Sequence, residues 1–258
     1  MQTFDHRSGV HLEIDGAHIY FEDHGADDAP ALLFLHGGMG SLEDFNGMLP
    51  LLERHFRVVG IDSRGHGAST LGPVGLSYRR LQADAESVAE QLGLERYSLV
   101  GFSDGGITAL RMAAAPQSRI DKLVVIGTDF QLAADDPVRK ILAGVTAASW
   151  EKKFPGTRSA YEQRNPEPDF EAFVEASVAM WLDEEGGNYP GDSIHDIRCN
   201  LLAVRGDADH LTSRTGLVAL CEAVEGAQML SIPFAGHEAH RDALETVMRS
   251  VNAFLDRR

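Results

Sequence analysis

Cysteine is scarce in this chain, and long apolar runs are absent. Cys199 and Cys221 are the two cysteines and show no Cys-x-x-Cys or zinc-ligand spacing, so neither a disulfide framework nor a zinc site is indicated. We expect both to be buried small side chains in a reducing compartment. No apolar stretch has membrane-spanning length. The first residues lack a basic stretch followed by an apolar one, so we expect no signal peptide and a soluble, cytoplasmic protein.

Positive charge is also in short supply. The 39 Asp and Glu residues outnumber the 23 Lys and Arg residues, which gives a formal net charge of −16. Such a chain repels nucleic-acid phosphates and anionic membranes, so we expect neither as a partner. A small-molecule substrate is the expected partner, and the composition does not indicate an oligomeric state. The length and ordinary apolar fraction allow a sizeable core, in one large domain or two small ones.

Short apolar runs alternate with helical patterns along most of the chain. After a predicted hairpin (Val10–Ile14 and Ala17–Glu22), the expected strands are Ala31–Leu35, Arg57–Ile61, Tyr97–Val100, Leu123–Ile126, Leu201–Arg205 and Gln228–Ile232. The expected helices are Ser41–Leu52, Arg79–Leu92, Gly105–Ala115, Arg214–Val224 and Arg241–Leu255. This alternation predicts an α/β fold with an open, mostly parallel sheet and helices on both faces.

Residues 129–194 interrupt the alternation. They contain no convincing buried strand and carry many aromatic residues, among them Trp150 and Trp181. Short helices are expected at Pro137–Ser149 and Asp169–Leu182. We interpret 129–194 as a helical lid inserted into one core domain formed by 1–128 and 195–258, because a long insertion in a regular sheet usually has a function. Extra helical packing is the alternative.

The pentapeptide Gly101-Phe102-Ser103-Asp104-Gly105 has the Gly-x-Ser-x-Gly form of a nucleophile elbow. Glycines two residues before and after the serine let a strand and a helix approach closely, which leaves the serine hydroxyl exposed above the sheet. Three fixed positions are a weak signal alone, and a glycine-rich turn with a surface serine has the same form.

A nucleophilic Ser103 needs a base to accept its proton and an acid to orient that base. In open α/β sheets these groups lie at the carboxyl ends of strands. Gly206-Asp207-Ala208-Asp209 follows one predicted strand, and Gly236-His237 follows the next. The order Ser, Asp, His is the order of the α/β-hydrolase triad.

From about residue 31 onward the chain resembles the α/β-hydrolase superfamily. The resemblance rests on five ordered segments, which are 36–40 (His-Gly-Gly-Met-Gly), 62–69 (Asp-Ser-Arg-Gly-His-Gly-Ala-Ser), the elbow, 206–209 and 235–237. It implies an α/β-hydrolase fold, a Ser103–His237–Asp209 triad and no cofactor. The acid of such a loop is usually the second one, which leaves Asp207 as a turn-forming residue.

The resemblance also implies an oxyanion hole made of two backbone N–H groups. One is the N–H of Asp104, and the other is the N–H of Gly38, with Met39 as the neighbouring candidate. Residues 101–110 resemble the valacyclovir hydrolase (biphenyl hydrolase-like) family, in which the acid matching Asp104 pairs with the α-amino group of amino-acid esters. Alternatively, Asp104 simply favours the positive end of its helix.

Other polar residues are interpreted as structural. His237-Glu238-Ala239-His240 is one residue shorter than the zinc-protease signature, so we predict no metal site. His240 is expected on the surface. Asp62 and Arg64 are expected to fix a loop through an ion pair between them, as in the related family.

We therefore expect a serine hydrolase that cleaves a carboxylic ester or related acyl substrate. The candidate substrate-binding residues are Met39, Asp104, Trp150 and Trp181. An aminopeptidase or amidase, a C–C bond hydrolase, a lactonase or a perhydrolase would use the same residues. A ligand receptor on the same fold is the non-enzyme alternative.

Overall fold

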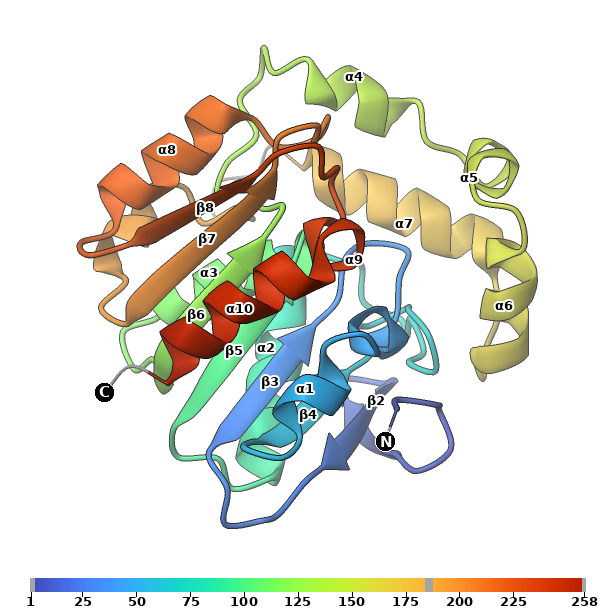
Figure 1. The fold of residues 1–258 in the computed structure, drawn as a ribbon. Helices are drawn as coiled ribbons and strands as arrows, with labels where there is room; N and C mark the ends of the chain where they lie inside the picture. The colour runs from blue at the N-terminus through green and yellow to red at the C-terminus, as the bar shows by residue number, and fades with distance from the viewer. Residues whose placement is uncertain (1–2, 184–187, 257–258) are drawn as a thin grey trace.

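An eight-stranded sheet runs through the centre of the molecule (Figure 1). The computed structural model describes residues 3–183 and 188–256. The strand order is β1-β2-β4-β3-β5-β6-β7-β8; β2 is antiparallel to β1 and β4, and all other neighbours are parallel. The strands are β1 (Val10–Ile14), β2 (Ala17–His24), β3 (Ala31–Leu35), β4 (Arg57–Ile61), β5 (Tyr97–Phe102), β6 (Ile120–Ile126), β7 (Asn200–Gly206) and β8 (Gln228–Ile232). The predicted open, mostly parallel sheet is confirmed.

Helices cover both faces of this sheet. One face carries α2 (Tyr78–Gln91), α3 (Asp104–Ala114) and α8 (Arg214–Ala223), and the other carries α1 (Leu49–Leu52), α9 (Ala239–Asp242) and α10 (Leu244–Leu255). Successive strand residues point to opposite faces, so Leu33 packs in one apolar cluster and Phe34 in the other. Both side chains are fully buried, which explains why the central strands are continuously apolar.

Two predicted core helices are shorter than expected. The predicted helix 41–52 is a 3₁₀ turn (Leu42–Phe45) followed by the single turn α1, because Pro50 lacks an N–H and is accommodated only in the first turn of a helix. The predicted helix 241–255 divides into α9 and α10 at Ala243, whose φ of −137° and ψ of 46° are not helical.

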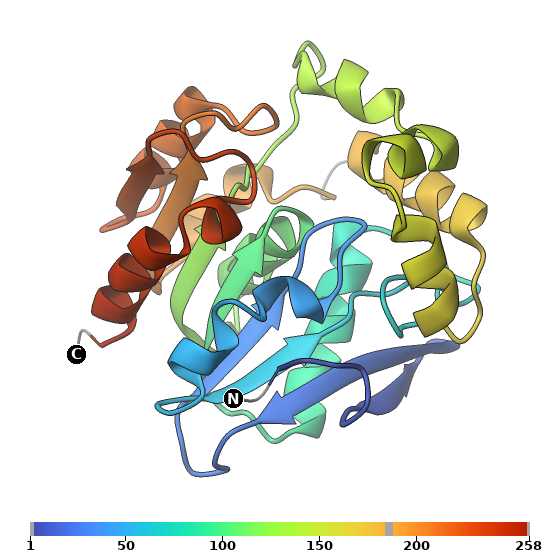
Figure 2. The same ribbon diagram turned by 45° about the vertical axis from the view of Figure 1, so that its right-hand side comes forward.

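The α-helices α4 to α7, which follow β6, lie over the carboxyl ends of the strands (Figures 1 and 2). They are α4 (Val138–Ala143), α5 (Ala147–Lys153), α6 (Thr157–Arg164) and α7 (Phe170–Leu182). The predicted helix 137–149 is divided because Thr146 caps a new helix, accepting a hydrogen bond from the Ser149 N–H. Apolar residues of α7 pack against Tyr78 and Leu81 of α2, which holds α4 to α7, called the lid below, against the sheet and its helices.

The predicted lid range, 129–194, includes residues 184–187, which lie outside the described residues. The ends of the predicted core domain, residues 1–2 and 257–258, lie outside them as well. The division of the chain into a core and a lid stays a prediction. Within residues 3–183 and 188–256, no helix combines the length and the apolar character that crossing a bilayer requires.

The prediction that both cysteines are buried is only half right. Cys199 and Cys221 are free and half-buried, since each contacts the apolar cluster from its edge. Partial burial still raises the pKa of the Cys199 thiol to about 11.

Candidate active site

Ser103 sits on a sharp turn between β5 and α3. Its φ of 50° and ψ of −116° are unusual for a residue with a side chain and indicate a strained backbone. The flanking glycines make the turn possible. A Cβ on Gly101 would lie 2.5 Å from the carbonyl oxygen of Gly105, and one on Gly105 would lie 2.0 Å from the carbonyl oxygen of Leu35. The geometry is that of a nucleophile elbow.

Three side chains from three strand ends form a continuous chain of contacts. His237 Nε2 lies 3.0 Å from Ser103 Oγ, and His237 Nδ1 lies 2.9 Å from Asp209 Oδ2. Burial alone would raise the pKa of Asp209, but hydrogen bonds from His237, Thr212 and the Leu211 N–H lower it to about 2. Asp209 is therefore ionised at neutral pH. An ionised Asp209 favours the imidazole tautomer with its proton on Nδ1, which leaves Nε2 free to accept from serine.

Asp207, the other acid of the loop, points away from His237. Its Oδ1 accepts a hydrogen bond from the Ser231 hydroxyl at 2.6 Å, and its Oδ2 lies 2.8 Å from the Arg214 guanidinium. The side chain is 27% exposed. The structure thus brings Asp209 to the histidine and leaves Asp207 in a surface ion pair.

The turn after β3 lies directly against the elbow. A Cβ on Gly37 would lie 2.7 Å from the Phe102 ring, and one on Gly38 would lie 2.4 Å from Asp104 Oδ2. His36 holds this turn: its Nε2 accepts from the Ser63 N–H at 2.9 Å, so its Nδ1 carries the proton and donates to the Gly37 carbonyl at 2.7 Å.

The orientation of this peptide bond follows from its planarity. Because the C=O of Gly37 and the N–H of Gly38 point in opposite directions across one trans peptide, the bond from His36 turns the Gly38 N–H away from His36. Met39 follows in the left-handed region with a φ of 62°, which completes the turn.

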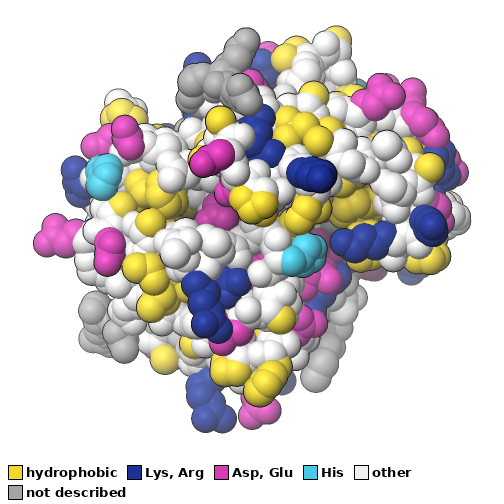
Figure 3. Space-filling view, turned by 90° about the horizontal axis from the view of Figure 1, so that it is seen from above, with side chains coloured by type: hydrophobic (Ala, Val, Ile, Leu, Met, Phe, Trp, Pro, Cys, Tyr) yellow, Lys and Arg dark blue, Asp and Glu magenta, His cyan; other side chains and the backbone are white. Residues whose placement is uncertain are grey.

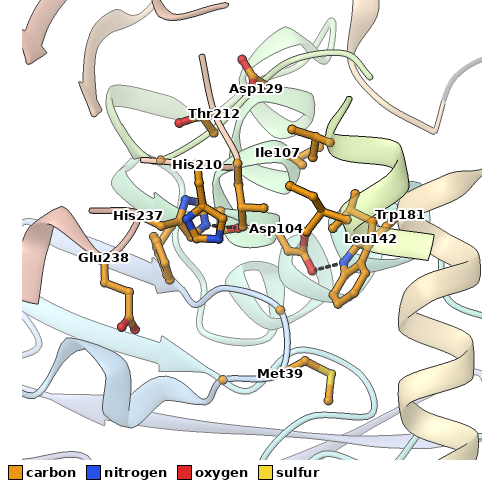
Figure 4. Close-up of a pocket in the computed structure, with 18 of the residues that line it drawn as sticks. Met39, Asp104, Ile107, Asp129, Leu142, Trp181, His210, Thr212, His237 and Glu238 are labelled. Atoms are coloured by element: carbon orange, nitrogen blue, oxygen red, sulfur yellow. Dashed lines mark hydrogen bonds between the residues drawn. The ribbon is translucent and has the colours of Figure 1, made fainter. Parts of the chain in front are cut away.

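The Asp104 carboxylate is buried beside the elbow. The residue is 7% exposed, and one of its oxygens accepts a hydrogen bond from the Tyr78 hydroxyl at 2.7 Å. The other accepts from Trp181 Nε1, also at 2.7 Å (Figure 4). Burial raises the pKa of this carboxyl. None of the ion pairs among the described residues involves Asp104. Its partners are therefore neutral donors from α2 and from the lid.

A cavity of about 570 Å³ opens above Ser103, between the strand ends and the lid. All four candidate substrate-binding residues line it, namely Met39, Asp104, Trp150 and Trp181. Ile107 of α3 and Leu142 of α4 add apolar walls (Figure 4). Seen from the lid side in Figure 3, yellow apolar side chains gather between charged groups of both signs. The cavity is mainly apolar, with Asp104 as a buried polar group.

Two structural expectations are wrong. His240 is 1% exposed rather than on the surface, because its ring packs against Phe45 and Phe102, and burial lowers its pKa to about 3. Asp62 and Arg64 do not pair. Arg64 instead forms an ion pair with Asp84 of α2 at 2.8 Å.

Asp62 has other partners. Its Oδ2 lies 2.7 Å from His6 Nε2 and accepts from the Ala68 N–H at 2.7 Å, and its Oδ1 accepts from the Leu42 N–H at 2.8 Å. Asp62 and Arg64 therefore fix the loop through different neighbours. Within the described parts of the chain, no group of three or more His, Cys, Asp and Glu side chains could hold a metal ion.

Three residues at the site were missed by the sequence reasoning: Tyr78, Thr212 and Arg205. Tyr78 reaches Asp104 from α2, and no local pattern indicates this contact. Thr212 donates to Asp209 Oδ2 at 2.6 Å, and its position three residues after an acid is a signal that could have been used. Arg205 donates to the backbone of the same loop.

The chain matches one family profile and resembles several known proteins. A family profile described as "alpha/beta hydrolase fold" matches residues 30–186. The chain is 28% identical over 251 residues to the serine hydrolase BPHL of Mus musculus, covering 95% of this chain and 85% of that protein. It is 39% identical over 114 residues to the bifunctional esterase/perhydrolase DCH of Acinetobacter calcoaceticus, covering 43% of this chain and 41% of that protein.

Solved structures show the same fold. A hydrolase from Pseudomonas aeruginosa has a TM-score of 0.78 at 21% identity and covers 97% of this chain and 99% of its own. The carboxylesterase CesB of Bacillus subtilis has a TM-score of 0.77 at 22% identity and covers 96% of this chain and 91% of its own. The family profile and the match to BPHL confirm the predicted family and its biphenyl hydrolase-like relatives. The chain belongs to the α/β-hydrolase family, among relatives named as serine hydrolases and esterases.

Proposed function

We propose that this protein is a serine hydrolase that cleaves carboxylic esters through Ser103, His237 and Asp209. The observation that carries the proposal is the unbroken series of contacts from Ser103 Oγ to His237 to Asp209 beneath the cavity. A serine hydroxyl is a weak nucleophile until a base accepts its proton, and His237 Nε2 is the base within reach. Relatives named as serine hydrolases and esterases support the same chemistry.

The reaction has two halves. Ser103 Oγ attacks the ester carbonyl while its proton passes to His237 Nε2, and the N–H groups of Asp104 and Gly38 stabilise the oxyanion that forms. His237 then returns the proton to the departing alcohol, which leaves an acyl group on Ser103. Water, deprotonated by His237, releases the acid and restores the serine. Asp209 stays ionised throughout and stabilises the imidazolium, consistent with its pKa of about 2.

The test is labelling and turnover on the intact chain. We expect a fluorophosphonate to label the protein once, on the peptide that contains Ser103, and p-nitrophenyl esters to be hydrolysed with release of one alcohol per acid. Varying the acyl length across the panel will show how far the apolar cavity accepts substrate. Binding of an ester with no release of alcohol would instead support the ligand-receptor alternative.

We further propose that the Asp104 carboxylate binds an amino group of the substrate. Three observations support this role: the carboxylate lines the cavity next to Ser103, it is 7% exposed, and its hydrogen-bond donors are neutral. A carboxylate offers about four acceptor sites, so two remain for an ammonium group. A cation there would compensate a charge that burial otherwise disfavours.

The experiment compares an amino-acid ester with its isostere that lacks the amine. We expect the wild-type kcat/KM to be about 30-fold higher for the amino ester than for its isostere, as for a buried charge pair. In Asp104→Asn, most of this preference should disappear. Glu238→Gln is the matched control, because the Glu238 carboxylate also lines the cavity but is 45% exposed and already paired with Arg241. If Asp104→Asn kept the wild-type ratio of kcat/KM between the two esters, Asp104 would not bind the amine. Its role would then be to connect α2 and the lid through its hydrogen bonds.

A further inference from the structure

Arg205 is a buried cation directly beneath the loop that carries Asp209. It lies near the end of β7 and is 5% exposed. Its Nε donates to the carbonyl oxygen of Thr212 at 2.8 Å, and its Nη2 donates to the carbonyl oxygen of Asp209 at 3.0 Å. Because the guanidinium is planar and rigid, one side chain holds both ends of the turn from Asp209 to Thr212.

That turn supplies most of the hydrogen bonds that orient the Asp209 carboxylate. The N–H groups of Leu211 and Thr212 donate to Oδ1 at 2.8 Å and 3.1 Å. The Thr212 hydroxyl donates to Oδ2 at 2.6 Å, and His237 Nδ1 contacts the same oxygen at 2.9 Å. The position of the turn therefore decides where Oδ2 meets the imidazole.

The charge of Arg205 acts to lower the pKa of the nearby carboxyls of Asp129 and Asp207, but Arg205 forms no close ion pair with either of these described residues. The contact with Asp207 is long, 3.8 Å from Nη1 to Oδ1, and Nη1 has no hydrogen-bond partner. The Asp207 carboxylate is engaged instead by Ser231 and Arg214. A buried cation carries a desolvation cost that an apolar residue at this place would avoid. The hydrogen bonds of the Arg205 side chain go instead to the carbonyl oxygens of Thr212 and Asp209.

We infer that Arg205 is a positioning residue, which holds the acid loop so that Asp209 Oδ2 meets His237. The inference rests on the proposed function, but it concerns a different residue and a different measurement. Arg205 is not among the described residues that line the cavity, so it acts only through the loop. Its loss should change the rate of the chemical step and leave substrate binding nearly unchanged.

The test uses Arg205→Met and Arg205→Lys in the full chain. We expect Arg205→Met to lower kcat roughly 100-fold, the effect of a misplacement of about 1 Å, with KM nearly unchanged. We also expect the downfield proton resonance of the His237–Asp209 hydrogen bond to shift or broaden. Arg205→Lys keeps the charge but cannot hold both carbonyls in one planar fork, so its loss should be intermediate.

Arg214→Met is the matched control, because Arg214 contacts Asp207 of the same loop at 2.8 Å but is 68% exposed. It should keep the wild-type kcat and resonance. The inference is overturned if both Arg205 variants keep them as well, or if Arg214→Met loses as much as Arg205→Met. If Arg205→Met does not fold, Arg205→Lys decides by the same readouts. Failure of wild type to react with a fluorophosphonate would refute the proposed function instead.

Discussion

Replacing Ser103 by alanine is expected to lower kcat for ester hydrolysis by about 10⁶-fold. The reason is that His237 then has no serine hydroxyl within reach, although the proposed oxyanion hole and the cavity remain. The measurement is the rate of p-nitrophenol release together with fluorophosphonate labelling, which should also disappear. The affinity for a non-hydrolysable substrate analogue should change little, because Ser103 is a small part of the cavity wall.

Ser103→Gly is the companion variant, and it separates chemistry from strain. Glycine adopts the φ of 50° and ψ of −116° of this position without a Cβ penalty, whereas alanine keeps the strain. We expect Ser103→Gly to be as inactive as Ser103→Ala. Its free energy of unfolding should be higher than that of Ser103→Ala by about 1 kcal/mol. Full labelling of either variant would show that the reactive serine lies elsewhere.

The sheet and the elbow were predictable because their signals are local. A strand buried on both faces must be apolar throughout, and Gly105 must lack a side chain because a Cβ there would lie 2.0 Å from the Leu35 carbonyl oxygen. The positions of the acid and the histidine follow from the rule that parallel strands place their carboxyl ends at one edge. These constraints act on residues that are near in sequence or fixed by the sheet.

The contacts that shape the cavity were not predictable in this way. Asp104 meets Trp181, a residue 77 positions away, through a hydrogen bond that depends on how α7 packs over the core. The expected pairing of Asp62 with Arg64 failed for a similar reason. Each side chain contacts a residue on another element. Arg64 pairs with Asp84 of α2, and Asp62 contacts His6 of the N-terminal segment.

Asp209→Asn is expected to lower kcat by about 10⁴-fold with little change in KM. An amide cannot stabilise the imidazolium, and its NH₂ group can face Nδ1 and favour the tautomer that has its proton on Nε2, where it cannot accept from Ser103. The carboxylate is also the acceptor for the Thr212 hydroxyl and for the Leu211 N–H, so the loop itself should be measured. Thermal unfolding of the variant distinguishes the two causes. A lower unfolding temperature would indicate a damaged loop, and an unchanged one would indicate that only the charge is lost.

Asp207→Asn is the matched control, because the two acids lie on one loop and have opposite environments. Asp207 bonds Ser231 and Arg214 at the surface, where solvent screens the ion pair and little of it contributes to stability. We therefore expect its kcat to remain near the wild-type value. Equal losses in the two variants would mean that the contact between Asp209 and His237 at 2.9 Å does not carry catalysis. A loss confined to Asp209→Asn would assign the acid, because both substitutions remove one charge from the same loop.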